Sequence, residues 1–114
     1  MFRMDGRAAF RHSARHLPGF LARLMKEAGA ETEDFACIVP HQASGAALEH
    51  GLARLGLPSE KVIRIFRDSG NQIATSIPSA LHEAIVSGRL HRGQLALLIG
   101  TSAGISLGGM VLRY

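Results

Sequence analysis

Residues 35–43 read FACIVPHQA, an apolar run that ends in a proline and is followed at once by a histidine. An unbroken apolar run of this length is typical of a strand that is buried on both faces. Pro40 ends the run, so His41 is expected at the carboxyl end of that strand. From Gln42 onward alanine and leucine recur at helical spacing, which predicts a helix up to Leu55. The stretch therefore predicts a strand, a histidine and a helix in direct succession.

The flanking sequence extends this pattern into an α/β fold. On the N-terminal side an apolar stripe closed by Gly29 indicates a helix, with a kink or a new helix start at Pro18. On the C-terminal side we expect a strand over Val62–Phe66, a turn at 68–71, a helix carrying Ile77, Leu81 and Ile85, a strand over Leu95–Ile99, a glycine-rich loop over Gly100–Gly104 and a last strand through Met110–Leu112. The last two strands are joined too tightly for a crossover and should be antiparallel. These elements predict a single domain over residues 1–114, with a mixed sheet covered by helices on both faces.

Composition and charge narrow the class of protein. The chain has 114 residues, of which 46% are hydrophobic and 19% charged, as in a folded globular domain. Its net charge of +4 raises the question of a polyanionic partner, and Arg3, Arg7, Arg11 and Arg15 would share one helical face. Nucleic acid is not expected, because aromatic residues make up only 5% of the chain and Trp is absent. A solvated basic face is the favoured interpretation, and contact with an anionic carrier or a coenzyme phosphate is the second.

The cysteine and histidine content argues against several kinds of site. A single cysteine, Cys37, excludes an internal disulfide, and its place within an apolar strand predicts a core thiol rather than a nucleophile. His12 and His16 have the spacing of a helical ligand pair but lack a third ligand, so no metal site is expected. No apolar run approaches the roughly 20 residues that span a bilayer. With no visible signal peptide, we expect a cytoplasmic protein without a membrane partner.

His41 and Asn71 are the candidate functional pair. Asn71 follows Gly70 after the predicted strand over Val62–Phe66, so both side chains are expected at carboxyl ends of strands, where α/β sheets bind ligands. The positive end of a helix that starts at Gln42 should keep His41 neutral near pH 7, and Asn71 adds an uncharged amide donor. Two neutral donors aimed at one oxygen can stabilise developing negative charge, such as that of a thioester enolate. Alternatively, His41 caps a strand end and Asn71 takes a left-handed turn conformation, and spacing alone favours this structural interpretation.

The C-terminal glycines also raise the possibility of a serine hydrolase. Two overlapping Gly-x-Ser-x-Gly matches span 100–104 and 104–108. The nucleophile elbow of such enzymes needs a strand, a turn and then a helix, whereas these glycines lead into a strand, and no histidine follows either serine. We therefore expect the glycines to let backbone approach a ligand or to form a tight connection.

Several motifs, taken together and in order, closely resemble one family. They are Met4-Asp5-Gly6-Arg7 with Phe10-Arg11, Val39-Pro40-His41-Gln42-Ala43, Gly70-Asn71 followed by Ile77-Pro78 and Ala80-Leu81, and Arg92-Gly93-Gln94-Leu95 through the glycine loop to Leu112-Arg113-Tyr114. The chain resembles the C-terminal half of β-ketoacyl-acyl carrier protein synthase III enzymes, in the thiolase superfamily, along nearly its whole length. The resemblance implies a thiolase-like half and a decarboxylating Claisen condensation. In that reaction a cysteine takes an acyl group from coenzyme A, and malonyl-acyl carrier protein supplies the carbanion.

The resemblance also implies roles for particular residues. His41 and Asn71 match the family histidine and asparagine that hydrogen-bond the thioester oxygen. The nucleophilic cysteine belongs to the N-terminal half, and Cys37 matches no catalytic position, so this chain alone is expected to be inactive. The implied partners are the N-terminal half, a second copy in a homodimer, and acyl carrier protein or acyl-coenzyme A as thioester substrates, with no further cofactor.

The chain departs from the family pattern at three places. The glycine triplet of the C-terminal loop, which shapes the oxyanion and acyl pocket, reads Ser102-Ala103-Gly104. Ser44 stands where asparagine is common, and Ala46 stands where a carrier- or coenzyme-binding arginine is expected. The remaining candidates for phosphate contact are Arg7, Arg11 and Arg54. These departures are typical of a divergent branch, and a non-catalytic binding or assembly module stays open as the alternative function.

Overall fold

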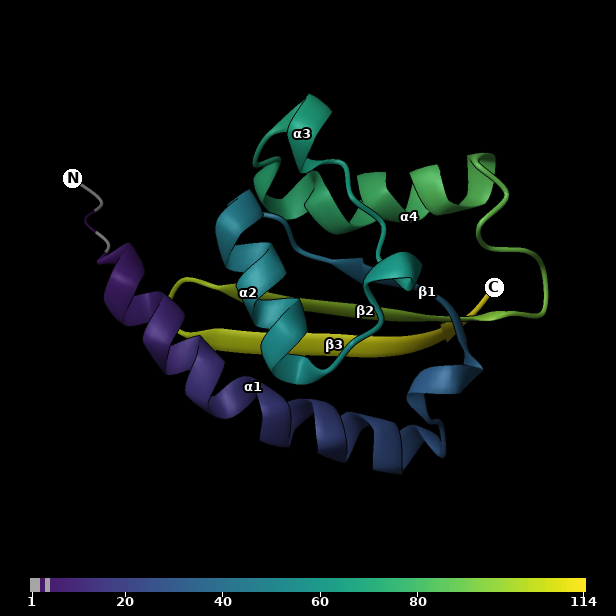
Figure 1. The fold of residues 1–114 in the computed structure, drawn as a ribbon, viewed down its shortest axis with the longest axis horizontal. Helices are drawn as coiled ribbons and strands as arrows, with labels where there is room; N and C mark the ends of the chain where they lie inside the picture. Colours follow the sequence, from purple (N-terminus) through teal and green to yellow (C-terminus); the bar gives the residue numbers. More distant parts are fainter. Residues whose placement is uncertain (1–2, 4) are drawn as a thin grey trace.

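In the part of the chain that the structure describes, the sheet has three strands in the order β1-β2-β3. In the computed structural model, which describes residue 3 and residues 5–114, β1 is Phe35–Pro40, β2 is Leu95–Ser102 and β3 is Ser106–Arg113. β1 and β2 are parallel, and β2 and β3 are antiparallel, so the sheet is mixed, as predicted. α1 (Gly6–Ala28) and α2 (Gly45–Leu55) lie on one side of it, and α4 (Ser76–Val86) lies on the other (Figure 1). The predicted α/β fold with helices on both faces is confirmed.

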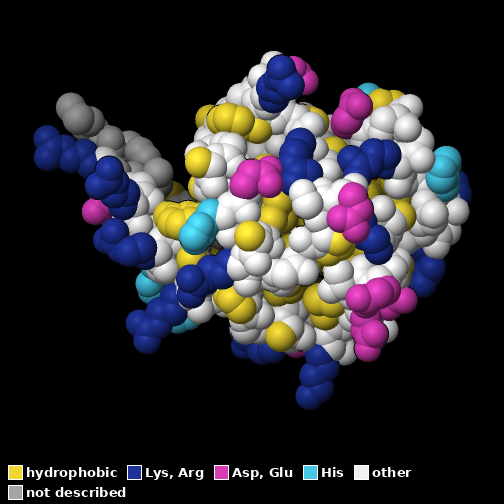
Figure 2. Space-filling view, viewed as in Figure 1, with side chains coloured by type: hydrophobic (Ala, Val, Ile, Leu, Met, Phe, Trp, Pro, Cys, Tyr) yellow, Lys and Arg dark blue, Asp and Glu magenta, His cyan; other side chains and the backbone are white. Residues whose placement is uncertain are grey.

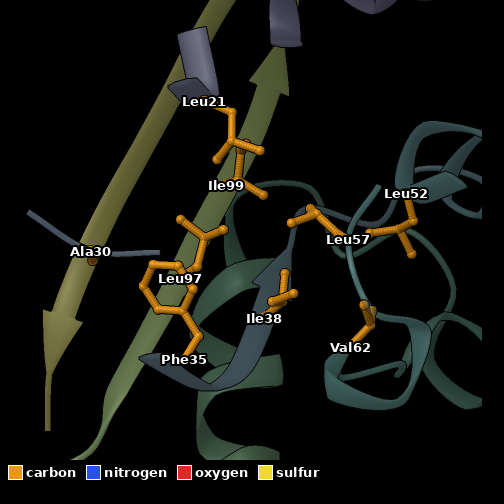
Figure 3. Close-up of a cluster of buried hydrophobic side chains, with 9 residues drawn as sticks. All are labelled: Leu21, Ala30, Phe35, Ile38, Leu52, Leu57, Val62, Leu97 and Ile99. Carbon is orange, nitrogen blue, oxygen red and sulfur yellow. The ribbon is translucent and has the colours of Figure 1, made fainter. Parts of the chain in front are cut away.

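Two apolar clusters, one on each face, hold the helices to the sheet. Figure 3 shows the first cluster, in which side chains of α1 and α2 meet β1 and β2: Leu21, Ala30, Phe35, Ile38, Leu52, Leu57, Val62, Leu97 and Ile99. The second cluster joins α4 to the opposite face through Ala80 and Ala84, which pack with Cys37, Val39 and Ala96. β1 contributes to both clusters, with Phe35 and Ile38 in the first and Cys37 and Val39 in the second, which is why its sequence is apolar without interruption.

α1 is one continuous helix from Gly6 to Ala28, although Pro18 lies inside it. Of the two predicted alternatives, a new helix start at Pro18 is excluded, and Figure 1 shows that α1 changes direction along its length, in keeping with a kink. The Oδ1 atom of Asp5 caps the start by accepting a hydrogen bond from the Ala8 N–H at 3.0 Å. Gly29, with φ of 62°, ends the helix as expected. Met4, which was part of the family resemblance, lies outside the described residues.

The prediction of a strand over Val62–Phe66 is wrong. Only Val62 forms a bridge to β1, opposite Ile38, and the short helix α3 (Phe66–Ser69) begins where the strand was expected to end. The chain still passes beside β1, because the Ile63 N–H donates to the Ile38 carbonyl at 2.9 Å. The apolar side chains of this segment are buried without a strand, so burial and strand formation are separate properties here.

Three element boundaries also differ from the prediction. α2 begins at Gly45 rather than Gln42, because Ser44 is extended and its Oγ atom caps the helix by accepting from the Ala47 N–H. β2 continues to Ser102 and β3 begins at Ser106, so the glycine-rich loop predicted over Gly100–Gly104 is mostly strand. Gly100 did not break β2, because the antiparallel pairing of this strand with β3 continues up to Ser102 and Ser106.

Candidate active site

His41 lies directly after β1, at the carboxyl end of the strand, as predicted. Its backbone N–H donates to the Ile99 carbonyl of β2 at 2.9 Å, which extends the parallel pairing by one residue. The side chain is half-buried, and burial lowers the pKa of His41 below its usual value. The predicted neutral imidazole is therefore supported, with loss of hydration on burial as the cause of the lowered pKa, while α2 starts at Gly45, three residues later than predicted.

Asn71 does not follow a strand, because α3 replaces the predicted strand. The side chain is exposed, and its Oδ1 atom accepts a hydrogen bond from the Ile73 N–H at 2.9 Å. Since Oδ1 is held in this way, the donor end of the amide, Nδ2, is turned away from Ile73. The left-handed conformation proposed for Asn71 in the structural alternative belongs instead to Ile73, with φ of 53°. A β-branched residue rarely adopts this conformation, and such strain is typical of functional segments.

Two contacts bring the segment after Asn71 to the end of β1. The Gln42 N–H donates to Oγ of Ser76, the first residue of α4, at 3.0 Å. A Cβ atom placed on Gly100 of β2 would lie 3.0 Å from the His41 Cβ and 3.2 Å from Cδ1 of Ile77. His41, the start of α4 and the end of β2 are therefore packed together at one end of the sheet.

Sequence reasoning missed Gln42, which is completely buried. Its Oε1 atom accepts from the N–H groups of Ile65 and Phe66 at 2.9 and 3.0 Å. Its Nε2 atom donates to the Ile63 carbonyl at 2.8 Å and, at 3.5 Å, to the Pro40 carbonyl. The only sequence signal was its position after His41 in a motif that also occurs in the family it resembles. An amide at this position satisfies the backbone groups that a strand over residues 62–66 would have paired.

A cavity of about 140 Å³ lies beside His41. Its walls come from α1, α2 and the ends of β1 and β2, and they include Phe10, Leu17, Arg54 and Thr101. Figure 2 shows apolar side chains at the junction between the first turns of α1 and the rest of the molecule, with basic side chains spread along α1. Most of the lining is apolar, so the cavity fits an aliphatic group better than a charged one.

The other candidate residues are placed differently. Arg54 lines the cavity, whereas Arg7 and Arg11 are exposed on α1 and do not line it. Asn71 is also outside its lining.

Ser102, Ala103 and Gly104 are exposed at the turn between β2 and β3, where a strand, a turn and a strand follow one another. This is the geometry of a hairpin and not of a nucleophile elbow. Gly100 and Thr101, just before this turn, are the residues of the segment that line the cavity.

Cys37 lies in the interior of β1 and has no exposed surface. Burial raises the pKa of its thiol, and the charge of Arg89 acts weakly in the opposite direction. The prediction of a core thiol is confirmed. Across residue 3 and residues 5–114, no three side chains of His, Cys, Asp or Glu are grouped as a metal site would require. None of the helices in the described part of the chain is long and apolar enough to cross a membrane.

The chain is similar to known proteins along nearly its whole length. Residues 25–114 match the family described as 3-oxoacyl-[acyl-carrier-protein (ACP)] synthase III C terminal. A curated relative, the β-ketoacyl-[acyl-carrier-protein] synthase III of Aquifex aeolicus, is 36% identical over 112 residues, which cover 98% of this chain and 36% of the relative. The chain thus spans about a third of the length of the curated relatives that it matches.

Solved structures show the same likeness. The crystal structure of 3-oxoacyl-[acyl-carrier-protein] synthase III from Aquifex aeolicus superposes with a TM-score of 0.90 at 36% identity, covering 98% of this chain and 36% of that one. The priming β-ketosynthase from the R1128 polyketide biosynthetic pathway superposes with a TM-score of 0.88 at 33% identity, covering 96% of this chain and 33% of that one. The likeness therefore includes both a 3-oxoacyl-[acyl-carrier-protein] synthase III and a priming β-ketosynthase of a polyketide pathway.

Proposed function

Because the chain belongs to the family of 3-oxoacyl-[acyl-carrier-protein] synthase III C-terminal domains, we propose that it is the C-terminal part of an acyltransferase that catalyses a decarboxylating Claisen condensation. The substrates are an acyl thioester of coenzyme A and a malonyl thioester on acyl carrier protein. The chain contributes hydrogen-bond donors for the enolate, and the N-terminal part of the enzyme contributes the cysteine that carries the acyl group.

His41 and Asn71 act in the decarboxylation step of this proposal. The bond between the malonyl α-carbon and its carboxylate breaks, carbon dioxide leaves, and the electron pair moves onto the thioester oxygen. Neutral N–H donors from both side chains stabilise that oxygen as its negative charge develops. The enolate carbon then attacks the acyl thioester carbonyl, a carbon–carbon bond forms, and the cysteine thiolate leaves.

The position of His41 is the observation that supports this role most strongly. Its side chain is half-buried at the carboxyl end of β1, lines the cavity, and has a pKa lowered by burial. A neutral imidazole can donate a hydrogen bond without placing a positive charge in the site. Oδ1 of Asn71 accepts from the Ile73 N–H, which leaves Nδ2, the donor end of the amide, to hydrogen-bond an incoming oxygen.

Substrate contacts follow from the cavity and its rim. Arg54 lines the cavity, and we assign it to a phosphate of the coenzyme or of the carrier, with Arg7 and Arg11 on α1 as further contacts. The turn Ser102–Gly104 contains fewer glycines than the corresponding family loop, and we assign it to the acyl pocket. Its exposure in this chain leaves it free to meet the N-terminal part.

Decarboxylation measured separately from condensation tests the proposal. The enzyme is assembled from this chain and its N-terminal part, and release of carbon dioxide from a malonyl thioester is followed. His41→Ala and Asn71→Ala should each reduce the rate by about 10²- to 10³-fold, the usual effect of losing one oxyanion donor. His82→Ala, at an exposed histidine of α4, is the matched control and should leave the rate unchanged.

Near-normal decarboxylation in both variants would overturn the roles of His41 and Asn71. An assembled wild-type protein that binds a carrier thioester but releases no carbon dioxide would instead favour a non-catalytic binding module.

A further inference from the structure

Gln42 has contacts that burial of a polar side chain alone does not require. The residue is fully buried, and both ends of its amide are hydrogen-bonded to the backbone of residues 63–66, which are distant from Gln42 in sequence. An amide has two donor hydrogens and one acceptor oxygen with two lone pairs, and all four are used here. A side chain whose donor and acceptor positions are all hydrogen-bonded is held in one orientation, so Gln42 holds its neighbours in one arrangement.

One set of these bonds fixes the start of α3. Ile65, the residue before α3, provides no side-chain cap for the helix. Oε1 of Gln42 accepts from the N–H groups of Ile65 and Phe66 and so takes the place of that cap. α3 then leads within one turn to Gly70 and Asn71.

The backbone of Gln42 fixes the other side of the same segment. Its N–H donates to Oγ of Ser76, which is 1% exposed and begins α4. The stretch from Phe66 to Ser76, with Asn71 at its centre, is therefore bonded at both ends to one residue. That residue is the direct neighbour of His41 in the chain.

We propose that Gln42 is a positioning residue that fixes the placement of Asn71 relative to His41, with Ser76 as its second anchor. The catalytic meaning of this inference rests on the proposed function, but the geometry that it describes lies entirely within this chain. Gln42 is completely enclosed and does not touch substrate; it acts by holding the backbone on which His41 and Asn71 are carried. A substitution at Gln42 should therefore displace both donors, His41 and Asn71, although neither residue is itself substituted.

Nuclear magnetic resonance of the full chain tests the positioning directly. In Gln42→Met, which keeps the length and apolar volume of the side chain but loses its hydrogen bonds, the His41 ring resonances and the Asn71 side-chain amide resonances should both shift. Gln94→Met is the matched control, because Oε1 of Gln94 also accepts a backbone N–H, that of His91, at a site far from His41 in the chain. It should move neither set of resonances. Wild-type resonances for both residues in a folded Gln42→Met chain would overturn the proposal.

Ser76→Ala keeps the test decisive if Gln42→Met does not fold. It removes one hydroxyl group and leaves the Gln42 side chain in place. The Asn71 amide resonances should shift while far-ultraviolet circular dichroism stays at the wild-type value. If these resonances are unchanged, the second anchor is wrong and the proposal fails.

Kinetics of the assembled enzyme separate positioning from the proposed function itself. Gln42→Met, or Ser76→Ala in its place, should lower kcat for malonyl decarboxylation by about 10- to 100-fold with KM within twofold of wild type, since small misplacement of catalytic groups acts on the chemical step. Unchanged kcat in the variant, together with a large loss in His41→Ala, would overturn the positioning role and leave the function standing. Shifted His41 and Asn71 resonances in Gln42→Met, together with a normal decarboxylation rate in His41→Ala, would instead overturn the proposed function and leave the positioning by Gln42 standing.

Discussion

Gly100 lies so close to His41 that a Cβ atom on the glycine would come within 3.0 Å of the His41 Cβ. Cδ1 of Ile77 would be 3.2 Å away on the α4 side. Gly108, which pairs with Gly100 across the β2–β3 ladder, has nothing within 4 Å of the corresponding position. The end of β2 therefore leaves little room for a side chain at the position that faces His41, whereas its partner on β3 has open space.

Gly100→Ala should displace His41. The added methyl group has to push His41 or Ile77 aside by a few tenths of an ångström, and overpacking of this kind costs about 1–3 kcal/mol. We expect a lower free energy of unfolding in urea and shifted His41 ring resonances. Gly108→Ala is the control, and equal effects of the two substitutions would contradict the close packing at Gly100.

Gly109→Ala should weaken the packing of α1 on β3. Its Cβ atom would lie 2.7 Å from Cδ2 of Leu24, 3.1 Å from Cε1 of Phe20 and 3.3 Å from the Leu98 carbonyl oxygen. The two side chains can move only by giving up contacts, so a loss of about 1–3 kcal/mol is expected. The loss is measured by urea unfolding of Gly109→Ala, with Gly108→Ala as the control. Stability equal to that of the control would show that α1 does not pack here as described.

The stability of the chain should depend on the protonation of His41. Burial lowers its pKa, so the unfolded chain binds a proton more readily than the folded chain as pH falls below the ordinary histidine value of about 6.5. Stability contributed by the neutral ring is therefore full above this value, falls as pH drops through it, and levels off below the folded-state pKa. The free energy of unfolding in urea, measured at pH 7.5 and at pH 5.5, should differ less between the two pH values in His41→Gln than in wild type.

An exposed histidine provides the control for this experiment. His82→Gln should keep the wild-type difference between the two pH values, since that side chain is exposed on α4. If His41→Gln and His82→Gln behave alike, His41 is not the group whose burial makes folding sensitive to acid.

The chain on its own should self-associate. Ile73, Val86 and Met110 are large apolar side chains that are 75%, 61% and 55% exposed. Burying such surface against a second copy is favourable when the proposed N-terminal partner is absent. Light scattering should give a mass above that of a monomer, and Ile73→Glu combined with Met110→Lys should lower it. A monomer at high concentration in the wild-type chain would refute this prediction.

The position of His41 could be predicted from local sequence, and the position of Asn71 could not. A proline directly after a short apolar run marks where a strand ends, so the residue next to it is located by neighbours in the chain. The setting of Asn71 depends on Gln42, which lies far away in sequence and supplies the hydrogen bonds that replace the predicted strand. The apolar run at 62–66 indicated burial correctly, but burial does not specify which groups pair with its backbone.

The amino-acid sequence alone was enough for the mixed α/β sheet with helices on both faces, the buried Cys37, the family resemblance and the end of β1 at His41, because each follows from periodicity, turn chemistry or motifs within short stretches. Tertiary structure alone decided that Gln42 links the segment around Asn71 to His41, that Gly100 packs against His41, and that burial lowers the pKa of that histidine. Each of these depends on atoms that are distant in the chain and become neighbours only on folding, so no local pattern of residues encodes them.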